Sequence, residues 1–210
     1  MPHKFLIVDD HSIVRTGIAI ILNSLYLNCE IDEATDGDTA LAKIKAKNYD
    51  LVTLDIHMPQ TDTSTLIPNV LAIKPELKIL VFTMASQGIF AKRYLKMGAR
   101  GFLSKDAPDD EIRMAVTQIL QNKKYISADL AMELSDDSLS NRAVNPFDNL
   151  SNRELQLAIH LIQGKSLGEI ANTLNIGAST VSTHKSNIFE KLNVTNIIEL
   201  SEMAKLYKII

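Results

Sequence analysis

Acidic residues follow two short, strongly apolar segments of this chain. Asp9 and Asp10 come directly after Lys4–Val8, and Asp55 comes directly after Leu51–Leu54. Apolar runs of this length are typical of strands that are buried on both faces of a parallel sheet, and such strands end at a shared edge. Carboxylates gathered at that edge would repel one another, which favours a divalent cation with oxygen ligands, such as Mg²⁺. The sequence therefore predicts an acidic cation pocket.

Two further polar residues are expected at the same edge. Thr83 follows the predicted strand 78–82, and Lys105 follows the predicted strand 101–104. A lysine ammonium suits a phosphoryl group, and a threonine hydroxyl can donate a hydrogen bond to a phosphoryl oxygen. A carboxylate such as Asp55 can act as a nucleophile and become an aspartyl phosphate, while the lysine and the cation offset the developing charge. The combination predicts phosphoryl chemistry at this edge.

The elements that would position these residues alternate between strand and helix. Across residues 1–121 this alternation occurs five times, which indicates an α/β fold with a five-stranded doubly wound parallel sheet and right-handed crossovers. The strands are expected at Lys4–Val8, Glu30–Thr35, Leu51–Leu54, Lys78–Phe82 and Gly101–Ser104. The first helix is expected to gather apolar residues on one face, namely Ile13, Gly17, Ile20, Ile21 and Leu25.

The composition changes after the last of these helices. Residues 122–149 are polar and turn-rich, and we interpret them as a linker with a short helix near Ser127–Leu134. Residues 150–210 have a helical period throughout and are expected to form a small all-α domain of four helices. Two of these helices are joined by the turn Asn175–Gly177, which is typical of a helix-turn-helix.

Capping residues mark the expected starts of helices in residues 150–210. Ser151 with Glu154, and Ser166 with Glu169, have the spacing of a capping box. Ser179 is expected to cap the third helix.

Composition narrows the class of protein. The chain has 210 residues, 46% of them hydrophobic, and a single cysteine, which excludes an internal disulfide and a cysteine-rich metal site. No segment approaches the ~20 apolar residues of a membrane span, and the N-terminus lacks a signal-peptide pattern. We expect a soluble, cytoplasmic protein with no membrane partner. The net charge of −3 does not by itself point to nucleic acid.

The first 121 residues resemble the receiver domain of a two-component response regulator. The matching features are Asp9-Asp10, Asp55 followed by Met58-Pro59, Thr83, and the run from Gly98 to Lys105. The resemblance implies that Asp55 accepts a phosphoryl group from a histidine kinase. It also implies Mg²⁺ ligation by Asp10, Asp55 and the backbone carbonyl of His57, with Asp9 acting mainly through water. Phe102 would be a switch aromatic that turns inward as Thr83 engages the phosphoryl group. The loop Gln60–Thr63 departs from the family, which more often has Asp-Gly there.

The segment from Leu150 to Tyr207 resembles the LuxR-type DNA-binding domain of the NarL/FixJ subfamily. The resemblance rests on Leu150–Glu154, Gly164–Ser166, Glu169–Ala171, Leu174–Ile176, Ser179–His184 and Lys191–Val194. It implies that the helix Ser179–Leu192 enters the major groove of double-stranded DNA. Its exposed face would present Ser182, Thr183, Lys185 and Ser186, while Thr180, His184, Asn187 and Lys191 contact or flank phosphates.

Some roles in this segment have structural alternatives. Many relatives carry lysine where this chain has Ser182, so one copy of the domain should bind DNA weakly and a homodimer would help. The last helix resembles a dimerisation helix, with Ile197, Leu200, Ser201 and Ala204 on one side. These four residues could instead close the helix bundle, and His184 could pack against the turn.

Together these features predict a phosphorylation-controlled, DNA-binding transcriptional regulator rather than an enzyme. One alternative is a regulator that a protein partner controls without phosphate. A second is a phosphatase-like hydrolase acting through Asp55, which would require a second acid where this chain has His57. A third treats the C-terminal helices as a protein-interaction module.

Overall fold

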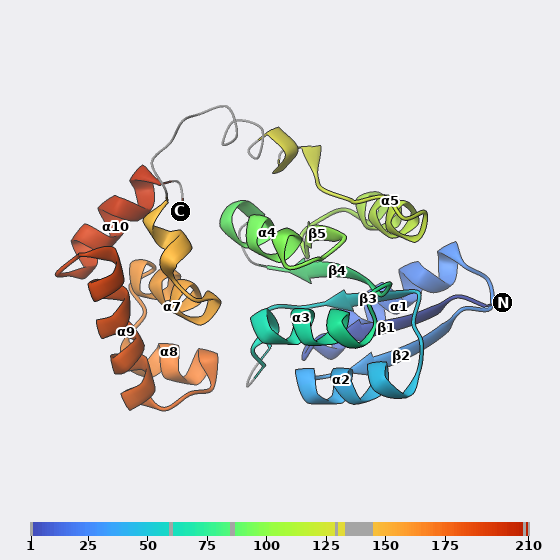
Figure 1. Cartoon of the computed structure of the whole chain (residues 1–210), viewed down its shortest axis with the longest axis horizontal. Coiled ribbons are helices and arrows are strands. Elements are labelled where there is room, and N and C mark those ends of the chain that lie inside the picture. Colours follow the sequence, from blue (N-terminus) through green and yellow to red (C-terminus); the bar gives the residue numbers. More distant parts are fainter. Residues whose placement is uncertain are drawn as a thin grey trace. The chain divides into compact units, whose positions relative to one another are not determined.

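The computed structural model describes residues 2–58, 61–84, 87–128, 130–132, 145–207 and 209 (Figure 1). The chain divides into two compact units, Met1–Ser135 and Asp136–Ile210. Residues 128 and 130–132 are helical, within the segment expected to be a short linker helix, whereas Pro59, Gln60 and residues 133–144 lie outside the described residues. In the part of the chain that is described, no helix has the length and apolar character needed to cross a membrane.

The first unit contains a parallel β-sheet. Within the described residues its five strands follow the order β2-β1-β3-β4-β5, which confirms the predicted doubly wound sheet. The strands are β1 (Lys4–Val8), β2 (Glu30–Ala34), β3 (Leu51–Leu54), β4 (Lys78–Thr83) and β5 (Gly101–Ser104). They agree with the predicted strands to within one residue because the apolar runs end abruptly at polar residues.

Helices cover the faces of this sheet, and all but the last of them connect successive strands (Figure 1). They are α1 (Ser12–Leu25), α2 (Gly37–Ala46), α3 (Thr63–Ile73), α4 (Gln87–Lys96) and α5 (Asp109–Leu120). Buried side chains of α1 and α5 pack against Phe5, Leu80 and Leu103 on one face of the sheet. The order of strands reverses between β1 and β3, and ligands of such sheets bind where the carboxyl ends of the strands meet this reversal.

The packing of α1 corrects one expectation. Of the predicted face, Ile21 is buried, but Ile13 and Ile20 are 77% and 64% exposed; Ile18 and Leu22, which the prediction omitted, are buried. The predicted face of this helix was therefore rotated away from the true one. Sequence periodicity failed here because α1 carries apolar residues around most of its circumference, so several faces satisfy the pattern.

The second unit is a bundle of short helices. They are the 3-10 helix η1 (Pro146–Asn149), α7 (Asn152–Ile162), α8 (Leu167–Leu174), α9 (Ala178–Leu192) and α10 (Ile197–Leu206). Both predicted capping boxes are present, at Ser151 with Glu154 and at Ser166 with Glu169. The predicted cap at Ser179 is wrong, because α9 begins at Ala178 and Gly177 is its N-cap.

Candidate functional site

Strand register brings the acids of the first unit together. Val8 of β1 pairs with Leu54 of β3, and the Asp55 amide donates to the Val8 carbonyl at 2.9 Å. Asp9 and Asp55 therefore leave neighbouring strands at the same level. Asp9, Asp10, His11 and Asp55 each offer a ligand atom within 4.8 Å of the others. This juxtaposition is the acidic pocket that the sequence predicted.

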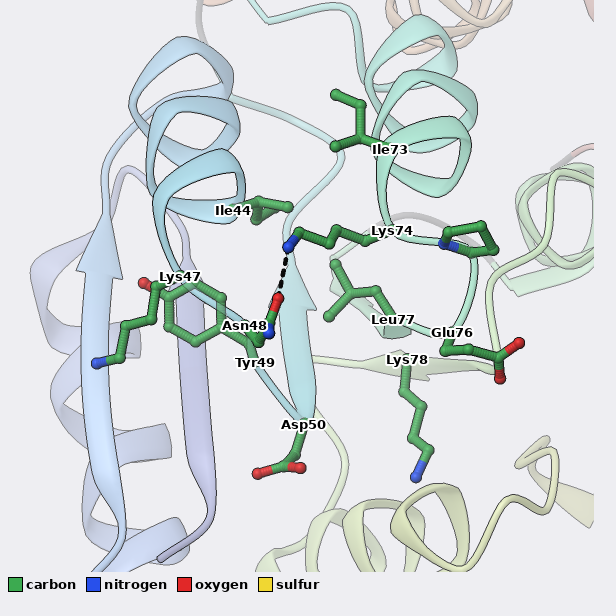
Figure 2. A pocket seen from close by; sticks show the side chains of 11 residues that line it. Ile44, Lys47, Asn48, Tyr49, Asp50, Ile73, Lys74, Glu76, Leu77 and Lys78 are labelled. Carbon is green, nitrogen blue, oxygen red and sulfur yellow. Dashed lines mark hydrogen bonds between the residues drawn. The ribbon is translucent and has the colours of Figure 1, made fainter.

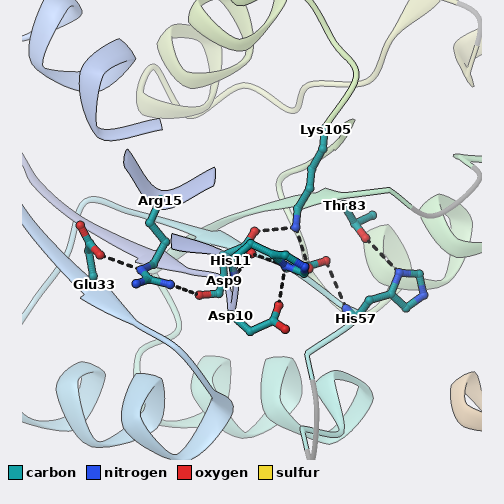
Figure 3. A network of polar contacts seen from close by, with 9 residues as sticks. Asp9, Asp10, His11, Arg15, Glu33, His57, Thr83 and Lys105 are labelled. Carbon is teal, nitrogen blue, oxygen red and sulfur yellow. Dashed lines mark hydrogen bonds and ion pairs between the residues drawn. The ribbon is translucent and has the colours of Figure 1, made fainter. Parts of the chain in front are cut away.

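Lys105 lies between two of these carboxylates (Figure 3). Its Nζ is 2.6 Å from Asp9 Oδ2 and 2.8 Å from Asp55 Oδ2, and all three side chains are buried. Burial by itself would lower the pKa of Lys105, but its hydrogen bonds to Asp55 and Asp9 outweigh that effect and raise the pKa. The ammonium group is therefore a fixed positive charge beside Asp55.

The donor set of this pocket suits a hard divalent cation. It is dominated by carboxylate oxygens, which Mg²⁺ prefers to nitrogen ligands. The Oδ1 atom of Asp10 is shielded from solvent and lies 2.9 Å from His11 Nδ1, yet it accepts no hydrogen bond of acceptable geometry among the described residues. An acceptor oxygen left in this state is suited to a cation. The backbone amide of His57 donates to Asp55 Oδ1 at 3.1 Å, and ligation by the His57 carbonyl remains a prediction.

Thr83 and Phe102 lie on the strands that flank the pocket. Thr83 ends β4 and is fully buried, and its Oγ1 lies 3.4 Å from Nδ1 of His57. The His57 ring in turn meets the edge of Phe90 on α4, with ring centroids 5.9 Å apart. Phe102 on β5 is also fully buried. Its role as a switch remains a prediction.

Sequence reasoning missed two interactions that support the pocket. Arg15 of α1 donates from Nη1 to the Asp9 carbonyl at 2.9 Å and from Nε to Glu33 Oε2 at 2.6 Å (Figure 3). The available signal was a basic residue in the first turn of a helix, where the helix dipole disfavours it. Thr63, the last residue of the segment that departs from the family, is the first residue of α3; it is buried, and its hydroxyl lies 2.8 Å from the Tyr94 hydroxyl. No local pattern predicts that second contact.

A separate cavity of ≈ 400 Å³ lies at the opposite edge of the sheet, between the segments that lead into β3 and β4 (Figure 2). Lysines line it, but they have partners within the protein. Lys74 donates to Asn48, Lys78 donates to the Leu120 carbonyl at 2.9 Å, and Lys47 forms an ion pair with Asp32. The cavity is remote from Asp55. Each of these three lysines already has a partner within the protein, so none of them is available to bind an anion.

The helix α9 places the predicted DNA-contacting residues in different environments. Thr180, Ser182, Thr183 and Ser186 are exposed, and Asn187 is partly buried. Lys185 is also partly buried, with its Nζ 5.3 Å from the centre of the Phe189 ring. These positions form the outward face that the resemblance assigned to base and phosphate contacts.

Lys191 and His184 differ from that expectation. Lys191 Nζ lies 2.9 Å and 2.7 Å from the two carboxylate oxygens of the buried Glu154 on α7. Burial tends to raise the pKa of Glu154, but hydrogen bonds from Lys191 and Ser151 outweigh it and hold the pKa below its ordinary value. His184 is partly buried, and its Nδ1 is shielded without a hydrogen-bond partner among the described residues. Lys191 therefore has a structural partner, and His184 packs within the domain.

The helix α10 corrects part of the predicted dimerisation surface. Leu200 and Ala204 are fully buried within their own domain, so they close the bundle and cannot reach a partner chain. Ile197 is 39% exposed, and Ser201 is partly buried. Ile198, which the sequence reasoning omitted, is 72% exposed. Helical periodicity identified an apolar side of this helix but could not say whether the domain itself would cover it.

Comparison with known proteins adds to this geometry. The family model "Response regulator receiver domain" matches residues 5–134, and "Bacterial regulatory proteins, luxR family" matches residues 148–204. The chain is 32% identical over 202 residues to the response regulator GacA of Pseudomonas aeruginosa, covering 96% of this chain and 94% of GacA.

Solved structures are similar over the whole length. The response regulator ChrA of a heme-sensing two-component system is 30% identical, with a TM-score of 0.51 over 100% of this chain and 99% of ChrA. The Salmonella typhimurium RcsB response regulator is 24% identical, with a TM-score of 0.62 over 97% of this chain and 99% of RcsB, and shows similarity of fold.

Proposed function

Because this chain belongs to the NarL/FixJ response regulators, which join a receiver domain to a LuxR-type DNA-binding domain, we propose that phosphorylation of Asp55 controls its binding to DNA. The protein is then a transcriptional regulator of a two-component system, acting in the cytoplasm where the DNA lies. The observation that carries this proposal is the buried Asp55 carboxylate, held beside Lys105 and the other acids at one edge of the sheet.

The chemical step is transfer of a phosphoryl group from a phosphohistidine of a histidine kinase. An Asp55 carboxylate oxygen attacks phosphorus, the P–N bond breaks, and the imidazole leaves with the electron pair of that bond and is protonated. Lys105, already 2.8 Å from Asp55 Oδ2, is placed to pair with the phosphoryl oxygens of the product. Thr83 is placed to donate to the same group. The product is an aspartyl phosphate.

Asp10, Asp55 and the His57 carbonyl would hold Mg²⁺ directly, and Asp9 would hold it through water. When bound, the cation supplies positive charge that offsets the negative charge of the phosphoryl oxygens. The chain's own contribution is to keep the carboxylates oriented. Lys105 bridges Asp9 and Asp55, while the His57 amide holds Asp55 Oδ1.

DNA binding is assigned to the outward face of α9, in the major groove. That face is mostly hydroxyl-bearing, and Lys191 is paired with Glu154, so a single domain has few cations for phosphates. Two linked copies would bind more tightly than one. We assign the homodimer contact to the accessible side of α10, which carries Ile197 and Ser201 together with Ile198.

Intact mass and size-exclusion chromatography test this function, with and without acetyl phosphate and Mg²⁺. The wild type should gain one phosphoryl group and shift toward a dimer, and Asp55→Asn should do neither. DNA mobility shifts at a fixed salt concentration should tighten only for the phosphorylated wild type. A wild type that binds DNA identically with and without its phosphoryl group would favour control by a protein partner. Sustained turnover of a phosphate ester would favour a hydrolase.

A further inference from the structure

We propose that Arg15 is a positioning residue for the cation pocket, acting with Glu33 to hold the Asp9–Asp10 loop against the edge strand β2. This inference rests on the proposed phosphoacceptor function and concerns residues that do not touch the phosphoryl group. Arg15 contacts the Asp9 carbonyl at 2.9 Å and the Glu33 carboxylate at 2.6 Å, and its side chain is only 14% exposed (Figure 3).

Hydrogen bonds made by both the amide and the carbonyl of Asp9 connect its backbone to β2, the second of them through Arg15. Its amide donates to the Ala34 carbonyl at 3.1 Å, and its carbonyl accepts from Arg15, which is paired with Glu33, the residue before Ala34. The side chain of Asp9 accepts hydrogen bonds from the His11 amide at 2.9 Å and from Lys105 at 2.6 Å. The position of Asp9, and of Asp10 beside it, therefore depends on two consecutive residues of β2.

An arginine suits this position because its planar guanidinium can donate in two directions at once. Its charge, by contrast, is unfavourable here. The residue lies in the first turn of α1, where the helix dipole disfavours a cation, and near a pocket that attracts cations. Glu33 offsets that charge. If Arg15 acts by placing the loop, its loss should weaken Mg²⁺ binding. If it acts only through its charge, its loss should strengthen Mg²⁺ binding.

Mg²⁺ affinity separates the two effects, and isothermal titration calorimetry of the full chain measures it directly. If charge alone mattered, Arg15→Gln would tighten Mg²⁺ binding and Glu33→Gln would weaken it. If Arg15 positions the loop, both variants weaken binding, by about tenfold for Arg15→Gln, as is usual for residues that orient metal ligands. Arg15→Lys should be intermediate, because one ammonium cannot reproduce the two-directional contact.

A matched control removes the same charge elsewhere on the receiver. Arg113 of α5 donates to Ser24 at the far end of α1, so Arg113→Gln should leave Mg²⁺ affinity unchanged. Glu33 is 46% exposed, so Glu33→Gln provides a variant whose folding is not at risk. Circular dichroism at the titration temperature confirms that each variant is folded, so that a loss of affinity is not a loss of structure.

The outcomes distinguish this inference from the function on which it rests. Weaker Mg²⁺ binding in both Arg15→Gln and Glu33→Gln supports the positioning role. Unchanged or tighter binding in Arg15→Gln overturns it, provided that the wild type binds Mg²⁺ and gains a phosphoryl group. If Arg15→Gln does not fold, unchanged binding in Glu33→Gln and Arg15→Lys overturns it equally. A wild type that neither binds Mg²⁺ nor accepts a phosphoryl group overturns the proposed function, and this inference with it.

Discussion

Replacing Asp10 with asparagine is expected to stabilise the metal-free receiver domain while removing most of its response to Mg²⁺. Three carboxylates, those of Asp9, Asp10 and Asp55, share a pocket in which Lys105 pairs with only two of them. Ligand atoms in the cluster lie within 4.8 Å of one another. At that separation two unit charges interact by ~3 kcal/mol with an effective dielectric constant of about 20. The charge of Asp10 therefore opposes folding until a cation binds.

The size of the gain is smaller than that upper figure. The Asp10 side chain is 27% exposed, so water screens part of the repulsion, and its contact with His11 is also lost. We expect the free energy of unfolding to rise by about 1–2 kcal/mol in metal-free buffer. Asparagine keeps the size and shape of the side chain, so packing should not change.

Hydrogen–deuterium exchange with mass spectrometry on the full chain is the appropriate assay, because it reports each domain separately. Amides of β1 and β3 report the unfolding of the receiver, and 1.4 kcal/mol corresponds to a tenfold change in exchange. In EDTA these amides should exchange more slowly in Asp10→Asn than in the wild type. With Mg²⁺, protection should rise in the wild type and stay nearly constant in the variant.

The control is Glu76→Gln, which changes the net charge equally at the opposite edge of the sheet and should leave exchange in β1 and β3 unchanged. Faster exchange of Asp10→Asn in EDTA would show that repulsion does not dominate the pocket. Equal Mg²⁺-dependent protection in both proteins would show that Asp10 is not a cation ligand.

The remaining predictions concern substitutions of single residues. Thr53→Val should stabilise the receiver by about 1 kcal/mol in denaturant unfolding, because the Thr53 hydroxyl is buried without a hydrogen-bond partner among the described residues. A loss of stability would mean that the hydroxyl forms a hydrogen bond in the folded protein. Pairing with Lys191 holds the folded pKa of Glu154 below its ordinary value of 4.5, so the ionised Glu154 contributes folding stability that is present above pH 4.5 and is lost as pH falls through the folded pKa. Unfolding measured across this pH range should show no such loss in Glu154→Gln, and the same pH dependence in variant and wild type would contradict this. Leu200→Ala should lower folding stability by about 2–5 kcal/mol, whereas Ile198→Ser should change it by no more than ~0.5 kcal/mol. Ile198→Ser should instead weaken dimeric DNA binding in mobility shifts, and intact dimerisation of this variant would exclude Ile198 from the dimer contact.

Much of the receiver could be predicted because the residues that form its site lie where its strands end. Apolar runs end at Asp9, Asp55, Thr83 and Lys105, so the residues that end the strands are also the polar residues of the site. Parallel pairing then requires that they share an edge. Capping boxes were equally predictable, since Ser151 and its partner three residues later form a local contact.

The remaining features depend on contacts between residues far apart in the chain. The outward face of α1, with Ile13 exposed, could not be predicted because that helix is apolar on several sides. The pairing of Lys191 with Glu154 joins residues 37 positions apart, and no local pattern distinguishes such a lysine from one that contacts phosphate. The same holds for Leu200, whose spacing fits both a dimer contact and the core of the bundle.

The sequence by itself determined the alternation of strands and helices, the placement of acids at strand ends and the capping boxes that begin α7 and α8, because each depends on local periodicity or on fixed short spacings. Tertiary structure alone decided which side chains bridge those elements. Lys105 is drawn between Asp9 and Asp55, and Arg15 joins the acidic loop to β2, because the register of the sheet brings their partners within hydrogen-bond distance. Such distances depend on how whole strands and helices pack, which no short segment specifies.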